Sequence, residues 1–343
     1  MARGEPSWWY AARPGLAPYA LAPASWLYGC VAAARMRLTT PERAARPVVC
    51  MGNFTAGGAG KTPLTIAVAD IIRRLGHEPW VLSRGYGGRH SGPVRVELGT
   101  HTARDVGDEP LLLARTAPTV VARDRRAGAA FIASAAAANA VILMDDGLQN
   151  SSLAKDLTLA IVDGARGIGN GWVMPSGPLR APLYLQTPLA SALIVNSARE
   201  VAPLETLDRI SDAIDGPTLR VWPEAAADVE RWRGAAVVAY AGIANPDRFF
   251  TLLESLGARI KERRAFADHH PFTDEDAAQL LDEARRHDAT LVTTEKDAAR
   301  LAGATQRCAE LFAASQTLTI RLAFADGDHA RLTTQIARAL QKK

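Results

Sequence analysis

The sequence predicts an α/β fold: a mostly parallel sheet with helices on both faces, followed by a second, smaller α/β lobe. From about residue 46, short apolar runs alternate with segments of helical periodicity, an order typical of parallel sheets with crossover helices. A glycine-rich loop follows the first apolar run, and a second, shorter alternating series begins near residue 233. We therefore expect a first domain over 46–225, a C-terminal lobe over 233–343 that closes a cleft, and a separate apolar segment over 1–40.

The first domain begins with PVVCMGN (47–53), a continuous apolar run that fits a strand buried on both faces. After the loop, TPLTIAVADIIRRLG predicts a helix, because Pro63 lies near its first turn and Gly76 follows its last. The apolar positions of one face of this helix are Leu64, Val68, Ile71, Ile72 and Leu75. Further strands of this domain are expected at 79–83, 118–122, 140–145, 157–163 and 192–197.

The second lobe is expected to start with a strand at 235–242. Asn245 can then cap a helix that has Pro246 in its first turn, and Thr273 can cap another whose first turn is acidic. Strands are expected at 290–295 and 317–324, and a last helix leads to the C-terminus.

Composition narrows the classes of function. The formal net charge of +4 is too small to indicate a nucleic-acid partner, and it suits an anionic phosphate ligand or an acidic membrane face. Cys30, Cys50 and Cys308 lie far apart without metal-ligand spacing, so we expect neither a disulfide nor a zinc framework. Nothing in the sequence implies a protein partner.

The N-terminal segment is the compositional outlier, because no charged residue lies between Arg13 and Arg35. Its length approaches a membrane span, but three prolines interrupt it. The flanking tryptophans, tyrosine and arginines are residue types that settle at a lipid headgroup boundary. We expect a helix lying on a membrane surface; a true span, a buried helix and a signal peptide are the alternatives.

The strongest motif is TAGGAGKT, residues 55–62, between a predicted strand and a predicted helix. This is the context of a phosphate-binding P-loop, in which glycines let backbone N–H groups approach phosphate oxygens. The expected nucleotide-binding residues are Thr55, Ala56, Gly57, Gly58, Ala59, Gly60, Lys61 and Thr62. Lys61 would reach the β- and γ-phosphates of ATP, and Thr62 would offer its hydroxyl to Mg²⁺. The first position of the motif is Thr55 rather than glycine.

The run VILMDDG (141–147) supports the P-loop prediction, because it is an apolar strand that ends in Asp145 and Asp146. A carboxylate at such a strand end, beside a P-loop, is where Mg²⁺ is held in P-loop enzymes. We therefore expect Asp145 and Asp146 at a Mg²⁺ site with Thr62; an ordinary Asp-Asp-Gly turn is the alternative.

Phosphoryl transfer to a hydroxyl also needs a group that accepts the hydroxyl proton. The candidates are Asp108, between a glycine and a proline, and the only paired histidines, His269 and His270. From residues alone, a helix cap for Asp108 and a surface loop for the histidines are equally open. The expected substrate-binding residues are Arg84, Tyr86, Arg123, Arg125 and Gln149. For Arg123 and Arg125, a solvated surface is an equally open alternative to phosphate binding.

Several motifs in succession resemble the tetraacyldisaccharide 4′-kinase family. They are GNFTAGGAGKTP (52–63), SRGYGG (83–88), VGDEP (106–110), DDGLQN (145–150), GNGWVMPSGPLRAP (169–182), YAGIANPDRFF (240–250), FADHHPFTDED (266–276) and TTEKDAARL (293–301). The resemblance runs from the N-terminal apolar segment nearly to the C-terminus, and the combination of GGAGKTP, DDGLQ and DHHPF is highly specific.

The resemblance implies transfer of the γ-phosphate of ATP, with Mg²⁺, to the 4′-hydroxyl of a tetraacyl-glucosamine disaccharide 1-phosphate, which gives lipid IVA. It also implies a peripheral location on the cytoplasmic face of the bacterial inner membrane, where the lipid substrate resides. In the family pattern Asp108 matches the general base and His269 its partner, while Lys61 matches the P-loop lysine. Asn150 stands where the family pattern has histidine, which leaves a role for this side chain open.

The main alternative is a P-loop switch ATPase at the membrane that is not a kinase. A GTPase is disfavoured, because TEKD (294–297) places its lysine one position late for the guanine-binding motif. A nucleotide-dependent membrane scaffold is disfavoured by the acidic and histidine motifs. An acceptor requirement for ATP turnover would separate the kinase from the switch ATPase.

Overall fold

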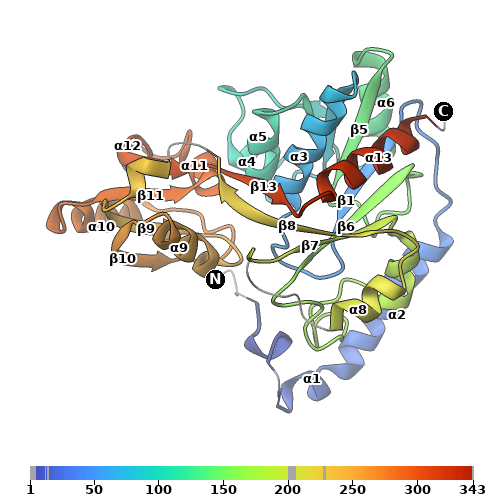
Figure 1. Cartoon of the computed structure of the whole chain (residues 1–343), viewed down its shortest axis with the longest axis horizontal. Coiled ribbons are helices and arrows are strands. Elements are labelled where there is room, and N and C mark those ends of the chain that lie inside the picture. Colours follow the sequence, from blue (N-terminus) through green and yellow to red (C-terminus); the bar gives the residue numbers. More distant parts are fainter. Residues whose placement is uncertain (1–4, 12, 14, 200–205, 227–228, 342–343) are drawn as a thin grey trace.

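The computed structural model describes residues 5–11, 13, 15–199, 206–226 and 229–341. Figure 1 shows two lobes of unequal size, with the N-terminal helices along the lower edge of the larger one. The α/β fold, with a large mostly parallel sheet, is as the sequence predicts.

The larger lobe is built on a nine-stranded sheet of order β13-β8-β7-β6-β1-β5-β2-β4-β3. Pairing is parallel from β8 to β4, and antiparallel only at the two edges of this sheet, where β13 joins β8 and β3 joins β4. The strands are β1 (Val48–Gly52), β2 (Glu78–Ser83), β3 (Val94–Arg95), β4 (Thr119–Val121), β5 (Ala140–Asp145), β6 (Leu157–Asp163), β7 (Ala192–Asn196), β8 (Thr218–Ala225) and β13 (Ile320–Phe324).

Helices cover both faces of this sheet because its strands are apolar on both sides. In β1, Val49 and Met51 pack against α3 and α13, whereas Val48 and Cys50 pack on the opposite face in the cluster that includes α6. The helices of this lobe are α3 (Lys61–Arg74), α4 (Ala103–Val106), α5 (Asp108–Ala114), α6 (Arg125–Ala135), α7 (Leu183–Gln186), η2 (Thr187–Leu189), α8 (Thr206–Asp212) and α13 (Asp328–Leu340).

The smaller lobe has a four-stranded parallel sheet of order β10-β9-β11-β12. Its elements are η3 (Val229–Trp232), β9 (Ala236–Ala241), α9 (Pro246–Ser255), β10 (Arg259–Ala265), α10 (Asp274–Arg286), β11 (Thr290–Thr294), α11 (Glu295–Leu301), α12 (Gln306–Ala314) and β12 (Ser315–Leu318). The capping expected at Thr273 is present, since its hydroxyl accepts a hydrogen bond from the Asp276 backbone N–H.

The C-terminal part of the chain differs from the expected 233–343 lobe. The single strand expected at 317–324 is two strands, and Thr319 separates β12 in the smaller sheet from β13 in the larger one. The last helix, α13, also packs on the larger sheet through Leu332 and Ile336. The smaller lobe is therefore an insertion between β8 and β13, whose ends lie together because Ala225 pairs with Ile320.

The N-terminal segment forms η1 (Ser7–Trp9), α1 (Ala17–Ala20) and α2 (Ala22–Leu38). On α2 the small residues Ser25 and Gly29 face the protein, while Trp26 is 73% exposed and Leu27 is 60% exposed. Among the described residues, no helix is long and apolar enough to span a bilayer.

Candidate active site

The P-loop connects β1 to α3 and is shaped by glycines with positive φ. Gly57 has φ 94° and Gly60 has φ 99°. A Cβ atom on Gly60 would lie 2.5 Å from Nδ2 of Asn196, which donates a hydrogen bond to the Ala59 carbonyl at 2.9 Å. Glycine is therefore required at position 60 both by conformation and by the close approach of β7.

Lys61 and Thr62 form the first turn of α3 and are buried. The Lys61 ammonium donates to Oδ1 of Asn53 at 3.2 Å and lies 3.7 Å from Oδ1 of Asp146. Its charge is thus held over the loop, where the phosphates of a nucleotide would lie in a P-loop enzyme.

At the first motif position, the backbone of Thr55 pairs with a neighbouring segment at Leu179. Its carbonyl accepts a hydrogen bond from Nε of Arg180 at 2.8 Å, and the Ala56 N–H donates to the Pro178 carbonyl at 2.7 Å. The 169–182 motif therefore supports the start of the P-loop.

Asp145 is the last residue of β5 and Asp146 follows it, and the parallel register that pairs Met51 with Asp145 brings them beside the P-loop. Asp146, in the left-handed region with φ 52°, receives both carboxylate contacts from one guanidinium nitrogen of Arg180, at 2.7 and 2.8 Å. Asp145 instead accepts hydrogen bonds from the Thr65 and Ser83 hydroxyls, at 3.5 and 3.4 Å.

Because their surroundings differ, the pKa values of the two carboxyl groups are shifted in opposite directions. Burial, together with the carboxylates of Glu109 and Asp146, raises the pKa of Asp145 to about 7. Burial alone would also raise the pKa of Asp146, but the charges of Lys61 and Arg180 outweigh it and hold that pKa well below its usual range. Asp145 is therefore the carboxylate that a bound cation would stabilise most.

Asp108 begins α5, and His269 lies in the loop after β10 of the smaller lobe. Their side chains meet at 3.0 Å between Oδ2 of Asp108 and Nδ1 of His269. Arg300 donates to the same carboxylate oxygen at 2.7 Å and is itself held by Asp297 at 2.6 Å. Burial would raise the pKa of Asp108, but the hydrogen bond from His269 and the charges of Lys296 and Arg300 lower it well below its usual range.

Of this pair, His269 lines the cavity, whereas Asp108 lies behind it with only 5% of its side chain exposed. His269 has φ 57°, a strained conformation for a non-glycine residue that is characteristic of functional sites. His270 points elsewhere: it contacts Asp276 at 2.9 Å and stacks on Phe266. The structure thus brings His269, and not His270, to Asp108.

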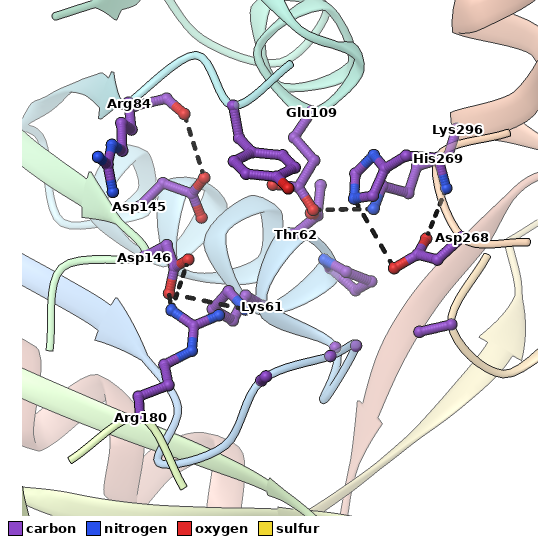
Figure 2. A pocket seen from close by; sticks show the side chains of 18 of the residues that line it. Lys61, Thr62, Arg84, Glu109, Asp145, Asp146, Arg180, Asp268, His269 and Lys296 are labelled. Atoms are coloured by element: carbon purple, nitrogen blue, oxygen red, sulfur yellow. Dashed lines mark hydrogen bonds and ion pairs between the residues drawn. The ribbon is translucent and has the colours of Figure 1, made fainter. Parts of the chain in front are cut away.

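Figure 2 shows two further residues that the sequence analysis did not single out, Glu109 and Lys296. Glu109 comes from the first turn of α5 and Lys296 from the first turn of α11, and their charged atoms lie 2.8 Å apart. Burial would raise the pKa of Glu109, but Lys296 and Lys61 lower it. Both residues lie inside quoted motifs, VGDEP and TTEKD, which was the available signal.

The candidate substrate residues have different environments. Arg84, Tyr86 and Arg123 line the cavity, and Tyr86 is 69% exposed with its ring 5.6 Å from that of His269. Arg125 also lines it but is only 3% exposed, and its guanidinium donates to the Ala122 and Asp145 carbonyls.

Gln149 uses its amide to donate to the Asn53 carbonyl at 2.8 Å and to the Gln186 side chain at 2.7 Å. It therefore buttresses the strand end that leads into the P-loop. Asn150 lines the cavity, and its amide oxygen accepts hydrogen bonds from the backbone and hydroxyl of Ser152.

One cavity of about 1060 Å³ contains most of these side chains. It is lined by Tyr28, Val31 and Arg35 of α2, by residues of the P-loop, and by apolar side chains that include Phe249 and Leu322. The same space is therefore bordered by α2, the P-loop and the smaller lobe.

Comparison with known proteins is consistent with this arrangement. The model of the family described as tetraacyldisaccharide-1-P 4′-kinase matches residues 17–341. A tetraacyldisaccharide 4′-kinase of Methylobacterium sp. (strain 4-46) is 49% identical, with 98% of each chain covered. One of Rhodopseudomonas palustris (strain BisA53) is 50% identical over 87% of this chain and 86% of the relative.

A solved structure is also similar. It is LpxK from Aquifex aeolicus, described as an "apo" form in complex with ATP. The TM-score is 0.71 at 25% identity, and the match covers 94% of this chain and 99% of that one.

Proposed function

The chain belongs to the tetraacyldisaccharide-1-P 4′-kinase family, and on this premise we propose how its cleft transfers phosphate. The reaction moves the γ-phosphate of ATP to the 4′-hydroxyl of a tetraacyl-glucosamine disaccharide 1-phosphate and gives lipid IVA, a step of lipid A biosynthesis. The observation that carries the proposal is that a P-loop lysine, Lys61, and a carboxylate-supported histidine, His269, border one cavity.

ATP binds with its phosphates on the loop 55–62. Lys61 contacts the β- and γ-phosphates, and backbone N–H groups of the glycine-rich turn surround them. The ATP complex of the similar Aquifex protein supports this assignment.

Mg²⁺ fits the residues at the end of β5, and we assign it to the Thr62 hydroxyl and the Asp145 carboxylate. All donors here are oxygens, as Mg²⁺ prefers, and the raised pKa of Asp145 shows that its neighbouring cations do not offset its burial and the nearby carboxylates. Mg²⁺ in nucleotide-binding enzymes is usually held by one or two carboxylates together with phosphate oxygens and water. When bound, Mg²⁺ neutralises charge on the phosphates.

The proton of the acceptor hydroxyl passes to the Asp108–His269 pair. Because Asp108 is ionised and faces Nδ1, it keeps the proton of the ring on Nδ1 and leaves Nε2, which lies 3.7 Å from Oδ2 of Asp268, as the acceptor. His269 therefore takes the proton, and Asp108 orients the ring and stabilises its charged form. The family resemblance suggests the opposite order, with Asp108 as base, but the low pKa and burial of Asp108 favour His269.

The protein acts at a membrane surface, on the cytoplasmic face of the bacterial inner membrane. Support comes from α2, which turns small residues to the protein and large apolar ones outward, the reverse of a helix on a water-facing surface. Arg35 and Arg37 in its last turn suit an anionic headgroup layer. Because α2 also borders the cavity, a lipid acceptor can reach the phosphates without leaving the bilayer.

The test is to incubate purified protein with labelled ATP and tetraacyldisaccharide 1-phosphate, and to look for a doubly phosphorylated lipid. Label in the lipid, with ATP consumption that depends on the acceptor, is the expected result. ATP consumption without lipid, and no label in the lipid, would favour the switch ATPase instead.

A further inference from the structure

Lys296 is in an unusual position for a lysine. It lies in the first turn of α11, where the positive end of the helix dipole disfavours a cation. The backbone does not need it there, because Thr294 already caps this helix by accepting a hydrogen bond from the Asp297 N–H. A residue that opposes the local preference at the edge of an active site suggests a functional requirement.

The charges around the ammonium group of Lys296 indicate why a cation is needed at this position. Burial would lower the pKa of Lys296, but the carboxylates of Glu109, Asp108 and Asp268 raise it, so the side chain is firmly cationic. Its partner is Glu109, at 2.8 Å, and the charge of Lys61 also acts on Glu109. One carboxylate thus balances two lysines, one from each lobe.

The two lysines border the same cavity from different elements. Lys61 is fixed by the P-loop, and Lys296 comes from the smaller lobe together with His269. Figure 2 shows Lys296 and His269 next to each other, on the side of Glu109 away from Asp145. Lys296 is therefore on the side where the acceptor hydroxyl must be deprotonated.

We propose that Lys296 is a further catalytic residue of the kinase, which contacts the phosphoryl group while it moves from ATP to the lipid. The bond between the γ-phosphorus and the bridging oxygen of ADP breaks, the bond from the acceptor oxygen to this phosphorus forms, and the hydroxyl proton goes to Nε2 of His269. Charge on the peripheral oxygens of the moving group is met by Lys61 on one side and Lys296 on the other. Lys296 keeps its proton throughout and exchanges Glu109 for phosphate oxygens.

The inference rests on the proposed function and is tested with three full-length variants assayed with Mg²⁺, ATP and tetraacyldisaccharide 1-phosphate. Lys296→Met removes the charge at similar length, and Lys296→Arg keeps it. Lys261→Met is the matched control, because Lys261 is an exposed lysine on β10 of the same lobe. For each variant we would measure kcat, the KM for ATP, thermal unfolding, and the Kd of ADP with aluminium fluoride, a mimic of the transferring phosphoryl group, in the presence of the lipid.

A cation that acts on the transferring group lowers kcat rather than nucleotide affinity. Lys296→Met should lower kcat by about 10²–10³, and change the KM for ATP by less than about threefold. It should weaken the aluminium fluoride complex at least tenfold more than it weakens binding of ADP alone. Lys296→Arg should retain at least about tenfold more activity than Lys296→Met, and Lys261→Met should resemble the unmodified protein.

Two results would overturn the inference. One is that Lys296→Met raises the Kd of ADP and the Kd of the aluminium fluoride complex by the same factor, which would mean that Lys296 only supports the site. The other is unchanged kcat in a folded Lys296→Met protein. Failure of the unmodified protein to phosphorylate the lipid would instead reject the proposed function itself, so the two failures are distinguishable. If Lys296→Met does not fold, Lys296→Gln, which also removes the charge but keeps a polar side chain, takes its place in the same comparison, and equal weakening of the two complexes or unchanged kcat in that variant would overturn the inference.

Discussion

Asp108 and His269 are separated by 161 positions in the chain and lie in different lobes, yet their side chains meet at 3.0 Å. Arg300, also from the smaller lobe, holds the same carboxylate oxygen. The unit that accepts the proton therefore exists only where the smaller lobe sits on the larger one, which makes the insertion part of the active site.

Replacement of either member of this unit should lower kcat strongly. General-base catalysis contributes about 10²–10⁴ in rate, so Asp108→Asn and His269→Ala should each reduce kcat within this range, with little change in the KM for ATP. Because both act on one proton, the double variant should be no worse than the more damaging single one. Steady-state kinetics at saturating lipid would show this, and additive losses would mean that the two residues act separately.

The neighbouring histidine provides a control for that experiment. His270 contacts Asp276 and the rings of Phe266 and Phe272, so its role is to hold the loop before α10. His270→Ala should lower thermal stability and leave kcat within about tenfold of normal, a smaller loss than general-base removal gives. A loss of kcat as large as that of His269→Ala would reverse the assignment within the pair.

Lys61→Ala should remove most kinase activity, because it deletes the charge that faces the β- and γ-phosphates. The fold should survive, since Asp146 keeps its contacts with Arg180. Turnover, ATP affinity and thermal unfolding would be measured on the same sample. Near-normal turnover in the folded variant would reject the P-loop assignment.

Asp145 and Asp146 should affect stability in opposite directions in the absence of divalent cations. The pKa of Asp145 is about 7 in the folded protein, whereas the pKa of an aspartate in an unfolded chain is about 3.9. Between these values the folded protein binds more protons than the unfolded chain, so the Asp145 carboxyl destabilises the protein increasingly as pH rises toward 7.

Asp145→Asn should therefore raise Tm in EDTA at pH 8, and raise it less at pH 5. Asp146→Asn should lower Tm at pH 8, because the pKa of Asp146 is depressed and its ionised form is the stabilised one. Thermal unfolding of both variants at the two pH values would test this. A lower Tm for Asp145→Asn at pH 8 would contradict the pKa shift.

Membrane binding should depend on the outward side chains of α2. Fully burying a large apolar side chain contributes about 1.5–3 kcal/mol, so the double change of Trp26 and Leu27 to serine should weaken binding to anionic phospholipid vesicles at least tenfold. Phe312→Ser, an exposed aromatic of α12 in the smaller lobe, should leave vesicle binding unchanged. Equal vesicle binding by all three proteins would place the membrane contact elsewhere.

These substitutions on α2 test membrane binding more specifically than a deletion of the N-terminal residues 1–38 would. The N-terminal segment is joined to the 169–182 motif, since Ser25 donates to the Val173 carbonyl and Ser176 to that of Pro18. Deletion would therefore also disturb the segment that supports Thr55 and holds Asp146 through Arg180.

The apolar strands and the P-loop could be predicted from the sequence because their signals are local. The run 47–53 became β1, and the helix after the loop became α3 with only small shifts at its ends. Strand β10 (Arg259–Ala265) could not be predicted, since this charged edge strand buries little of its surface. The split of 317–324 at Thr319 was also out of reach, because sheet membership is decided by pairing with β8 and β11 rather than by composition.

The candidate active site could also be predicted only as far as its signals are local in the sequence. Asp108, Asp145 and Lys61 could be picked out by motif, but the electrostatic roles of neighbouring residues depend on contacts between lobes. Glu109 and Lys296 meet only in the folded chain. Gln149, expected at the substrate, lines the cavity and also donates a hydrogen bond to the Asn53 carbonyl. His269 and His270 are adjacent in sequence, and only their different partners separate their roles.

The insertion of the smaller lobe between β8 and β13 has a consequence for synthesis on the ribosome. Strand β13 supplies the last edge of the nine-stranded sheet and is made only after the whole inserted lobe. At synthesis rates of about 5–20 residues per second, the intervening residues 226–319 take roughly 5–20 seconds to appear. During that interval the edge of β8 has no partner strand, and the apolar surface that later receives α13 has no cover. The nascent chain is then most open to pairing with other chains, so chaperone demand should peak late in translation.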